Sequence, residues 1–145
     1  MVKIREIKKQ DRDAWCNFYE QMCEDEFLAF DPDENPSIWL DDILKSKNRR
    51  CYVAINNSEI IGYSYSIKTK KHTPWTISFG VLPHCRQWGL GKTLVKTLLR
   101  NSDDPNSFYA KVSKENSICQ KLLDSLGFES YMASKNYKSF KFKKN

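Results

Sequence analysis

The chain has 145 residues, enough to bury one hydrophobic core and too few for two ordinary domains, so we expect a single domain over residues 1–145. Apolar residues make up 40% and charged residues 29%, which excludes a disordered or collagen-like protein, and no apolar run approaches the ~18 residues of a membrane span. The formal net charge of +6 is unevenly distributed, because residues 24–34 hold six acids and no base.

The amino terminus and the cysteines bear on the compartment. Residues 1–7 carry charges and lack the apolar core of a signal peptide. The five cysteines are odd in number and widely spaced, with no C-x-x-C pair and only two histidines to complete a metal site: Cys16, Cys23, Cys51, Cys85 and Cys119. We therefore expect reduced and mostly buried thiols, no metal ion and a cytoplasmic protein.

Hydrophobic periodicity predicts the first elements in chain order. They are a strand at residues 2–7, a helix at 11–22, a helix that starts at Asn35, Pro36 and Ser37, and strands at 50–55 and 60–68. The intervening residues 56–59, Asn-Asn-Ser-Glu, have the composition of a hairpin turn. Gly62 inside the second of these strands predicts a bulge.

The second half begins with an apolar alternation over Trp75–Val81, which predicts a strand. It is followed by a helix through Leu90, Leu94, Val95, Leu98 and Leu99, a strand through Phe108, Ala110 and Val112, a helix at 116–126 ended by Gly127, and a hairpin of residues 128–133 and Tyr137–Lys143. This order predicts an α/β (α+β) fold with one mixed sheet of about seven strands, a central parallel pair and four main helices on both faces.

Two glycines, Gly89 and Gly91, lie where the strand period changes to the helix period. A helix start has unpaired N–H groups and the positive end of the helix dipole, so this junction predicts an anion site with phosphate as the expected ligand. A P-loop is excluded because its first glycine would fall at Arg86. The dinucleotide fingerprint is excluded because its third small residue would be Leu94.

The remaining pattern, Arg-x-x-Gly-x-Gly-Lys between a strand and an amphipathic helix, resembles the pyrophosphate motif of the GNAT superfamily of acyl-CoA N-acyltransferases. The stretch from Asn116 to the Leu-Gly-Phe at 126–128 is similar to a second family segment, and the order of elements matches over the whole chain. The resemblance implies an N-acetyltransferase with acetyl-CoA as co-substrate, bound by Val81, Arg86, Gln87, Trp88, Gly89, Leu90, Gly91, Lys92, Thr93 and Asn116. Asn116 also fits a helix cap, and Arg86 and Lys92 also fit solvated surface residues.

The resemblance leaves the catalytic groups open. The family's usual strand carboxylate has no counterpart, because the strand offers only threonine and serine, and we take Glu26 of the acidic segment as a candidate base. Leu123 occupies the position of the family's general-acid tyrosine. Tyr131 or Tyr137 from the closing hairpin could replace that tyrosine, although we expect both side chains to pack in the core.

Family geometry implies that the acidic segment 24–34 lies at the acceptor mouth. We therefore expect a cationic amine as acceptor, such as a polyamine, an aminoglycoside-like compound or a lysine-bearing peptide, no membrane partner, and a monomer or homodimer. Two alternatives stay open. A non-catalytic acyl-CoA sensor fits Leu123, and nucleic-acid binding fits the interleaved lysines and aromatics of residues 135–144, although inward packing of Phe140 and Phe142 explains the same pattern.

Overall fold

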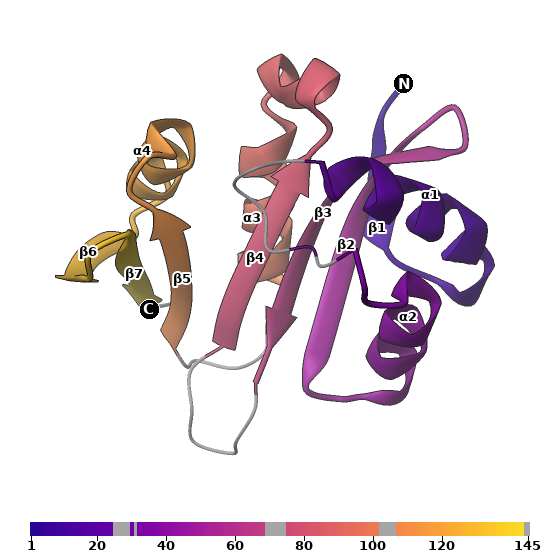
Figure 1. Ribbon diagram of the computed structural model, residues 1–145, viewed down its shortest axis with the longest axis horizontal. Helices are drawn as coiled ribbons and strands as arrows, with labels where there is room; N and C mark the ends of the chain where they lie inside the picture. The colour runs from indigo at the N-terminus through magenta and orange to yellow at the C-terminus, as the bar shows by residue number, and fades with distance from the viewer. Residues whose placement is uncertain (25–29, 31, 69–74, 102–106, 144–145) are drawn as a thin grey trace.

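The computed structural model describes residues 1–24, 30, 32–68, 75–101 and 107–143. Seven strands form one sheet in the order β1-β2-β3-β4-β5-β7-β6 (Figure 1). The strands are β1 (Lys3–Glu6), β2 (Arg49–Asn56), β3 (Glu59–Ile67), β4 (Trp75–Val81), β5 (Ser107–Ser113), β6 (Glu129–Ala133) and β7 (Tyr137–Lys143). The pair β4–β5 is parallel and the other neighbouring strands are antiparallel, which confirms the mixed sheet with its central parallel pair.

The described residues contain four α-helices and two short 3-10 helices. These are α1 (Arg12–Met22), α2 (Pro36–Lys45), α3 (Leu90–Arg100) and α4 (Ser117–Ser125), with η1 (Lys9–Asp11) and η2 (Pro83–Trp88). The side chain of Asn35 accepts a hydrogen bond from Ser37 N, and Pro36 opens α2, as the sequence predicts. No helix in this part of the chain is long and apolar enough to cross a membrane.

The expected first helix begins one residue late, because Asp11 has another role. Its carboxylate accepts two hydrogen bonds from the Arg5 guanidinium, at 2.7 and 2.8 Å, and one from the backbone N–H of Lys8 at 2.7 Å. Asp11 therefore belongs to η1 and ties the end of β1 to the start of α1.

The hairpin between β2 and β3 has the predicted turn and bulge. Asn57 and Ser58 have φ values of 51° and 66°, so both central residues are left-handed, as a tight two-residue turn requires. Ala54 pairs with Gly62 and Ile55 with Ile60, which leaves one extra residue on β3 next to Gly62. A Cβ atom on Gly62 would lie 3.0 Å from Leu94 Cδ1, so the glycine also lets α3 approach the sheet closely.

The helices cover both faces of the sheet, as expected. Trp15 and Phe18 of α1 pack against the Tyr63 ring at centroid distances of 5.9 and 5.8 Å. The neighbouring residue in β3, Gly62, faces Leu94 of α3, so α1 and α3 lie on opposite faces. The aromatic cluster around Trp15 therefore forms the core on the α1–α2 side.

The interleaved lysines and aromatics near the carboxyl end follow from strand packing. Phe140 is 1% exposed and Phe142 is partly buried against the core, while the lysines alternate with them along β7. The two phenylalanine rings are thus used in packing, whereas the third aromatic residue of this stretch, Tyr137, is 43% exposed.

Candidate functional site

The parallel pair at the centre of the sheet opens after two residues. Trp75 pairs with Phe108 and Thr76 with Tyr109, and no later residue of β4 pairs with β5 in the described chain. Figure 1 shows the two strands diverging toward their carboxyl ends. The sheet is therefore continuous at the amino-terminal ends of β4 and β5 and split toward their carboxyl ends.

Backbone groups of β4 face this gap. Leu82 N–H donates to the Ile61 carbonyl at 2.8 Å. Because hydrogen-bonding positions alternate along an antiparallel pair, the N–H and C=O groups of Phe79 and Val81 point away from β3, toward β5. A ligand with amide groups could therefore pair with β4 in the way a strand does.

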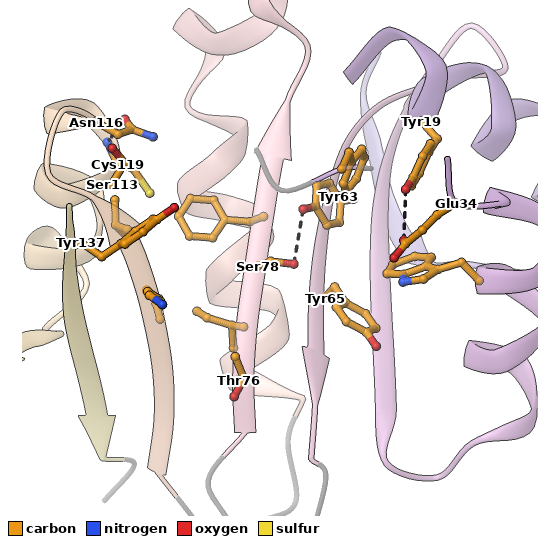
Figure 2. A pocket seen from close by; sticks show the side chains of 17 residues that line it. Tyr19, Glu34, Tyr63, Tyr65, Thr76, Ser78, Ser113, Asn116, Cys119 and Tyr137 are labelled. Atoms are coloured by element: carbon orange, nitrogen blue, oxygen red, sulfur yellow. Dashed lines mark hydrogen bonds between the residues drawn. The ribbon is translucent and has the colours of Figure 1, made fainter. Parts of the chain in front are cut away.

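A cavity of about 580 Å³ occupies the α1–α2 side of the split. Its described lining consists of Tyr19, Phe30, Glu34, Trp39, Tyr63, Tyr65, Thr76, Ile77, Ser78, Phe79, Ala110, Lys111, Val112, Ser113, Asn116, Cys119 and Tyr137. Figure 2 shows two walls: Ser113, Asn116, Cys119 and Tyr137 on the β5–α4 side, and Tyr19, Glu34, Tyr63 and Tyr65 opposite them. The hydroxyls of Thr76 and Ser78 lie between the walls, on β4.

The glycine loop lies beyond the cavity, at the end of β4. Gly89 has φ +69° and occupies the cap position before α3, and Thr93 donates to the Gly89 carbonyl from both its N–H and its hydroxyl, at 3.3 and 3.2 Å. The N–H groups of Leu90, Gly91 and Lys92 form the first turn of α3, where a helix has no internal partner for them. This geometry suits an anion.

Close packing explains why position 91 is occupied by glycine. A Cβ on Gly91 would lie 3.1 Å from Leu122 Cδ1 of α4 and 3.9 Å from Val81 Cγ2. The loop, the end of β4 and α4 therefore meet at Gly91. The residue serves close packing between elements as well as any approach of a ligand.

Arg86 is exposed and contacts the backbone of the same loop. Its Nε donates to the Val81 carbonyl at 2.9 Å, so the side chain closes the turn between β4 and α3. Lys92 is half-buried on the first turn of α3, and Leu90 is 7% exposed. Gln87 and Trp88 belong to η2, but their side chains lie outside the described structure.

Asn116 caps a helix and also lies beside the cavity, so its place is compatible with both roles considered from the sequence. Its Oδ1 accepts a hydrogen bond from Cys119 N at 3.1 Å, which caps α4, and the residue also lines the cavity. A cap uses only the carbonyl oxygen of the side chain, so the NH2 group stays able to donate.

The catalytic candidates are distributed unevenly. Leu123 is fully buried and cannot supply a proton. Tyr131 is the extra residue of a bulge between β6 and β7, with its ring 5.5 Å from that of Tyr109, and it does not line the cavity. Tyr137 lines the cavity, and Lys111 Nζ lies 4.6 Å from its ring centroid. Tyr131 and Tyr137 are 41% and 43% exposed, so the expectation of core packing is wrong for both.

Only part of the acidic segment can be placed. Glu26 lies outside the described residues, and Glu24 lines a separate cavity of about 550 Å³ between α1 and η2. Glu34 lines the main cavity, where it accepts a hydrogen bond from the Tyr19 hydroxyl at 3.3 Å (Figure 2). Among the described lining residues Glu34 is the sole acid, and sequence reasoning had not singled it out from its neighbours.

Three further groups of the cavity, Tyr63, Tyr65 and Cys119, are kept neutral by burial. Burial raises the pKa values of the Tyr63 and Tyr65 hydroxyls above the ordinary phenol value, and it raises the pKa of Cys119 to about 12. These groups carry no charge at neutral pH. The five cysteines are free; Cys51 and Cys85 are fully buried, whereas Cys16, Cys23 and Cys119 are half-buried, so the expectation of mostly buried thiols is wrong.

These features agree with comparisons to known proteins. The model of the acetyltransferase (GNAT) family matches residues 12–128. This chain belongs to the GNAT acetyltransferase family. No curated protein matches it, whereas many solved structures share its fold.

Three solved structures illustrate the likeness of this GNAT chain. An acetyltransferase of the GNAT family from Streptococcus pneumoniae has a TM-score of 0.87 at 18% identity, with 100% of both chains covered. A GCN5-related N-acetyltransferase from Kribbella flavida has a TM-score of 0.80 at 18% identity, covering 98% of this chain and 97% of that one. The protein yncA from Salmonella typhimurium, determined with its cofactor acetyl-CoA, has a TM-score of 0.82 at 17% identity, covering 99% and 94%. The predicted family and fold are thus confirmed.

Proposed function

We propose that this GNAT enzyme transfers the acetyl group of acetyl-CoA to a primary amine that is cationic in solution. The observation that carries the proposal is the split between β4 and β5, which leaves the backbone of Phe79 and Val81 facing a gap beside the glycine loop. Family membership supports an acetyl donor, and the likeness to yncA, which was determined with acetyl-CoA, supports that donor in particular.

The chain offers groups for each part of such a donor. The first-turn N–H groups of α3 suit a pyrophosphate, with Lys92 and Arg86 adding positive charge. The backbone of Phe79 and Val81 and the NH2 group of Asn116 suit the amides of a pantetheine arm. Acetyl-CoA would supply an activated acetyl group as a thioester.

Transfer further requires a neutral amine and a stabilised oxyanion. Glu34 attracts the ammonium form of the acceptor and can accept its proton, directly or through water. The Val81 N–H is the main-chain donor for negative charge that develops on the carbonyl oxygen. Tyr137 is the candidate for the role of the missing family tyrosine, because its phenol lines the β5 side of the cavity.

The test combines donor binding with turnover. Calorimetric titration should show saturable binding of acetyl-CoA and no comparable binding of ATP or NADH, and free thiol should appear when an amine is added. The variant Glu34→Gln should raise the acceptor KM at least several-fold, whereas Asp13→Asn, which removes one charge from the exposed side of α1, should not. Equal effects of the two variants would show that Glu34 acts only through net charge.

A second function follows from Leu123. A fully buried leucine replaces the proton donor of the family, so a module that binds acyl-CoA without turnover fits the same site. Saturable acetyl-CoA binding without thiol release across the amine panel would establish this alternative.

A further inference from the structure

We propose that the acceptor is a monoamine whose single ammonium group is attached to a flat aromatic body, and that Trp39 and Tyr65 select it. The proposal rests on the proposed acetyl transfer and specifies the substrate class of the same cavity. It narrows the expected cationic amine to one with a single ammonium group and sets aside the polyamine and aminoglycoside examples.

The lining of the cavity is rich in rings and poor in charge. Seven of the seventeen lining residues are aromatic: Tyr19, Phe30, Trp39, Tyr63, Tyr65, Phe79 and Tyr137. The described lining holds one acid, Glu34, and one base, Lys111, so its net charge is zero. A polyamine or aminoglycoside would bring several ammonium groups to a wall whose described residues include one carboxylate, and each ammonium left unpaired would lose hydration without compensation.

Trp39, which would contact the aromatic body of the acceptor, is held in place by neighbouring aromatic rings. Trp39 is stacked on Trp15 at 4.7 Å with an interplanar angle of 10°, and Trp15 is fully buried. Trp39 also contacts the Tyr65 ring, at a centroid distance of 4.6 Å and an interplanar angle of 48°. Trp39 is half-buried, and both Trp39 and Tyr65 line the cavity.

The cavity has a polar region that suits an ammonium group and, beside it, an apolar region that suits a ring. Glu34 and the Tyr19 hydroxyl form a polar pair at one edge of the ring wall (Figure 2). Trp39 and Tyr65 provide apolar surface beside it, with Thr76 and Ser78 on the way to the β4–β5 gap. One ammonium and one ring fit this arrangement, since aromatic rings attract both stacked rings and cations.

The experiment compares three amines at saturating acetyl-CoA: 2-phenylethylamine, n-butylamine and spermidine. We expect kcat/KM for 2-phenylethylamine to exceed that for n-butylamine about tenfold, with spermidine no better than n-butylamine. The variant Trp39→Leu should abolish this ratio, and Tyr65→Leu should reduce it. Ile38→Ala, a change at the adjacent and 58% exposed position of α2, is the matched control and should leave it unchanged.

The outcomes distinguish this proposal from the proposed function. Acetyl-CoA turnover with spermidine preferred, or an aryl-to-alkyl ratio that survives in both folded variants, would overturn the acceptor class and leave acetyl transfer intact. If no amine is acetylated, the same amines are titrated calorimetrically against protein saturated with CoA. Preferential binding of the aromatic amine then supports the proposal, and weaker or equal binding refutes it.

Discussion

Gly89 is the residue on which the shape of the donor loop depends. Its φ of +69° is unfavourable for residues with a Cβ, and most of all for β-branched ones. We expect Gly89→Val to lower the free energy of unfolding by about 1–2 kcal/mol and to weaken acetyl-CoA binding at least tenfold, since the first-turn N–H groups of α3 would turn away. Denaturant titration and calorimetry measure the two effects.

The variant Gly89→Asn separates conformation from approach of the ligand. Asparagine tolerates the left-handed region, and among the described residues no heavy atom beyond the chain neighbours lies within 4 Å of the Cβ position of Gly89, so this variant should keep most of the stability. If the valine variant binds acetyl-CoA as tightly as the parent chain, the loop is not the donor site.

Tyr137 and Tyr131 are both tyrosines of the closing hairpin, but only Tyr137 lines the cavity. We expect Tyr137→Phe to lower kcat about tenfold with little change in KM, because its hydroxyl lies in the cavity lining and the leaving group is a thiol of pKa ~8.5 that solvent can also protonate. Tyr131→Phe should change kcat less, since the bulge turns that ring toward Tyr109. Stopped-assay thiol detection over a range of pH measures both; equal losses would exclude Tyr137 as the proton donor.

Local chemistry explains which site residues could be predicted. The role of Gly89 depends on its own dihedral angles, and the capping role of Asn116 depends on the next three residues, so both follow from the sequence. The position of Glu34 depends on how α1 and α2 pack over β3, and nothing in residues 24–34 distinguishes it from the other acids. Long-range packing of this kind is invisible to motif spacing.

At the level of elements, the ion pair between Arg5 and Asp11 joins β1 to α1. The Arg5 hydrogen bonds hold the pKa of Asp11 below the usual carboxyl value. A carboxyl whose folded pKa is depressed contributes stability above its unfolded pKa of ~3.9, and that contribution is lost as pH falls through the folded value. The stability of the protein should therefore decline in this acid range.

The variant Asp11→Asn tests this contribution. At pH 7 it should lower the free energy of unfolding by about 1 kcal/mol, because one charge-assisted pair and one backbone contact are weakened. The difference between variant and parent should shrink as pH falls from ~4 through the lower folded pKa of Asp11, where the folded carboxylate becomes protonated. Urea titrations at several pH values measure it, and a difference independent of pH would refute the electrostatic origin.

Helices and strands followed from periodicity, and Gly62 indicated the bulge in β3, but two other irregularities did not follow from the sequence. Alternation over Trp75–Val81 and helical spacing from Leu90 onward are properties of the residues themselves, so β4 and α3 have the expected type and place. The bulge at Tyr131 leaves no mark in the sequence, because it arises from the register of β6 against β7. The later start of α1 likewise comes from Arg5, six residues earlier.

In the whole molecule, the β5–α4–β6–β7 unit is joined to the rest of the sheet, within the described chain, through one strand pair, β4–β5, with only two paired residues on each strand. A donor arm that pairs with Phe79 and Val81 would bridge the split and stabilise it. We expect acetyl-CoA to slow amide hydrogen exchange in residues 77–81 and in β5, with little change in β1 and β2. Mass-spectrometric exchange with and without ligand measures this; uniform protection across the sheet would contradict a bridging arm.

The arrangement of the sheet was predictable because few topologies suit this order of elements. A strand, a helix and a strand in the middle of the chain require a parallel pair, and hairpins on either side require antiparallel neighbours. The early separation of β4 from β5 could be expected only by resemblance to the family, since no residue of either strand forbids longer pairing.

The stacking of Trp15 on Trp39 should give the unlabelled protein a characteristic circular-dichroism signal. Two indoles at 4.7 Å and 10° couple their electronic transitions, so the pair should dominate the near-ultraviolet circular dichroism of a chain with four tryptophans. One member of the pair lines the cavity and the other is buried. Occupation of the acceptor side should therefore be visible directly in the spectrum of the unmodified protein, whatever the chemistry that follows.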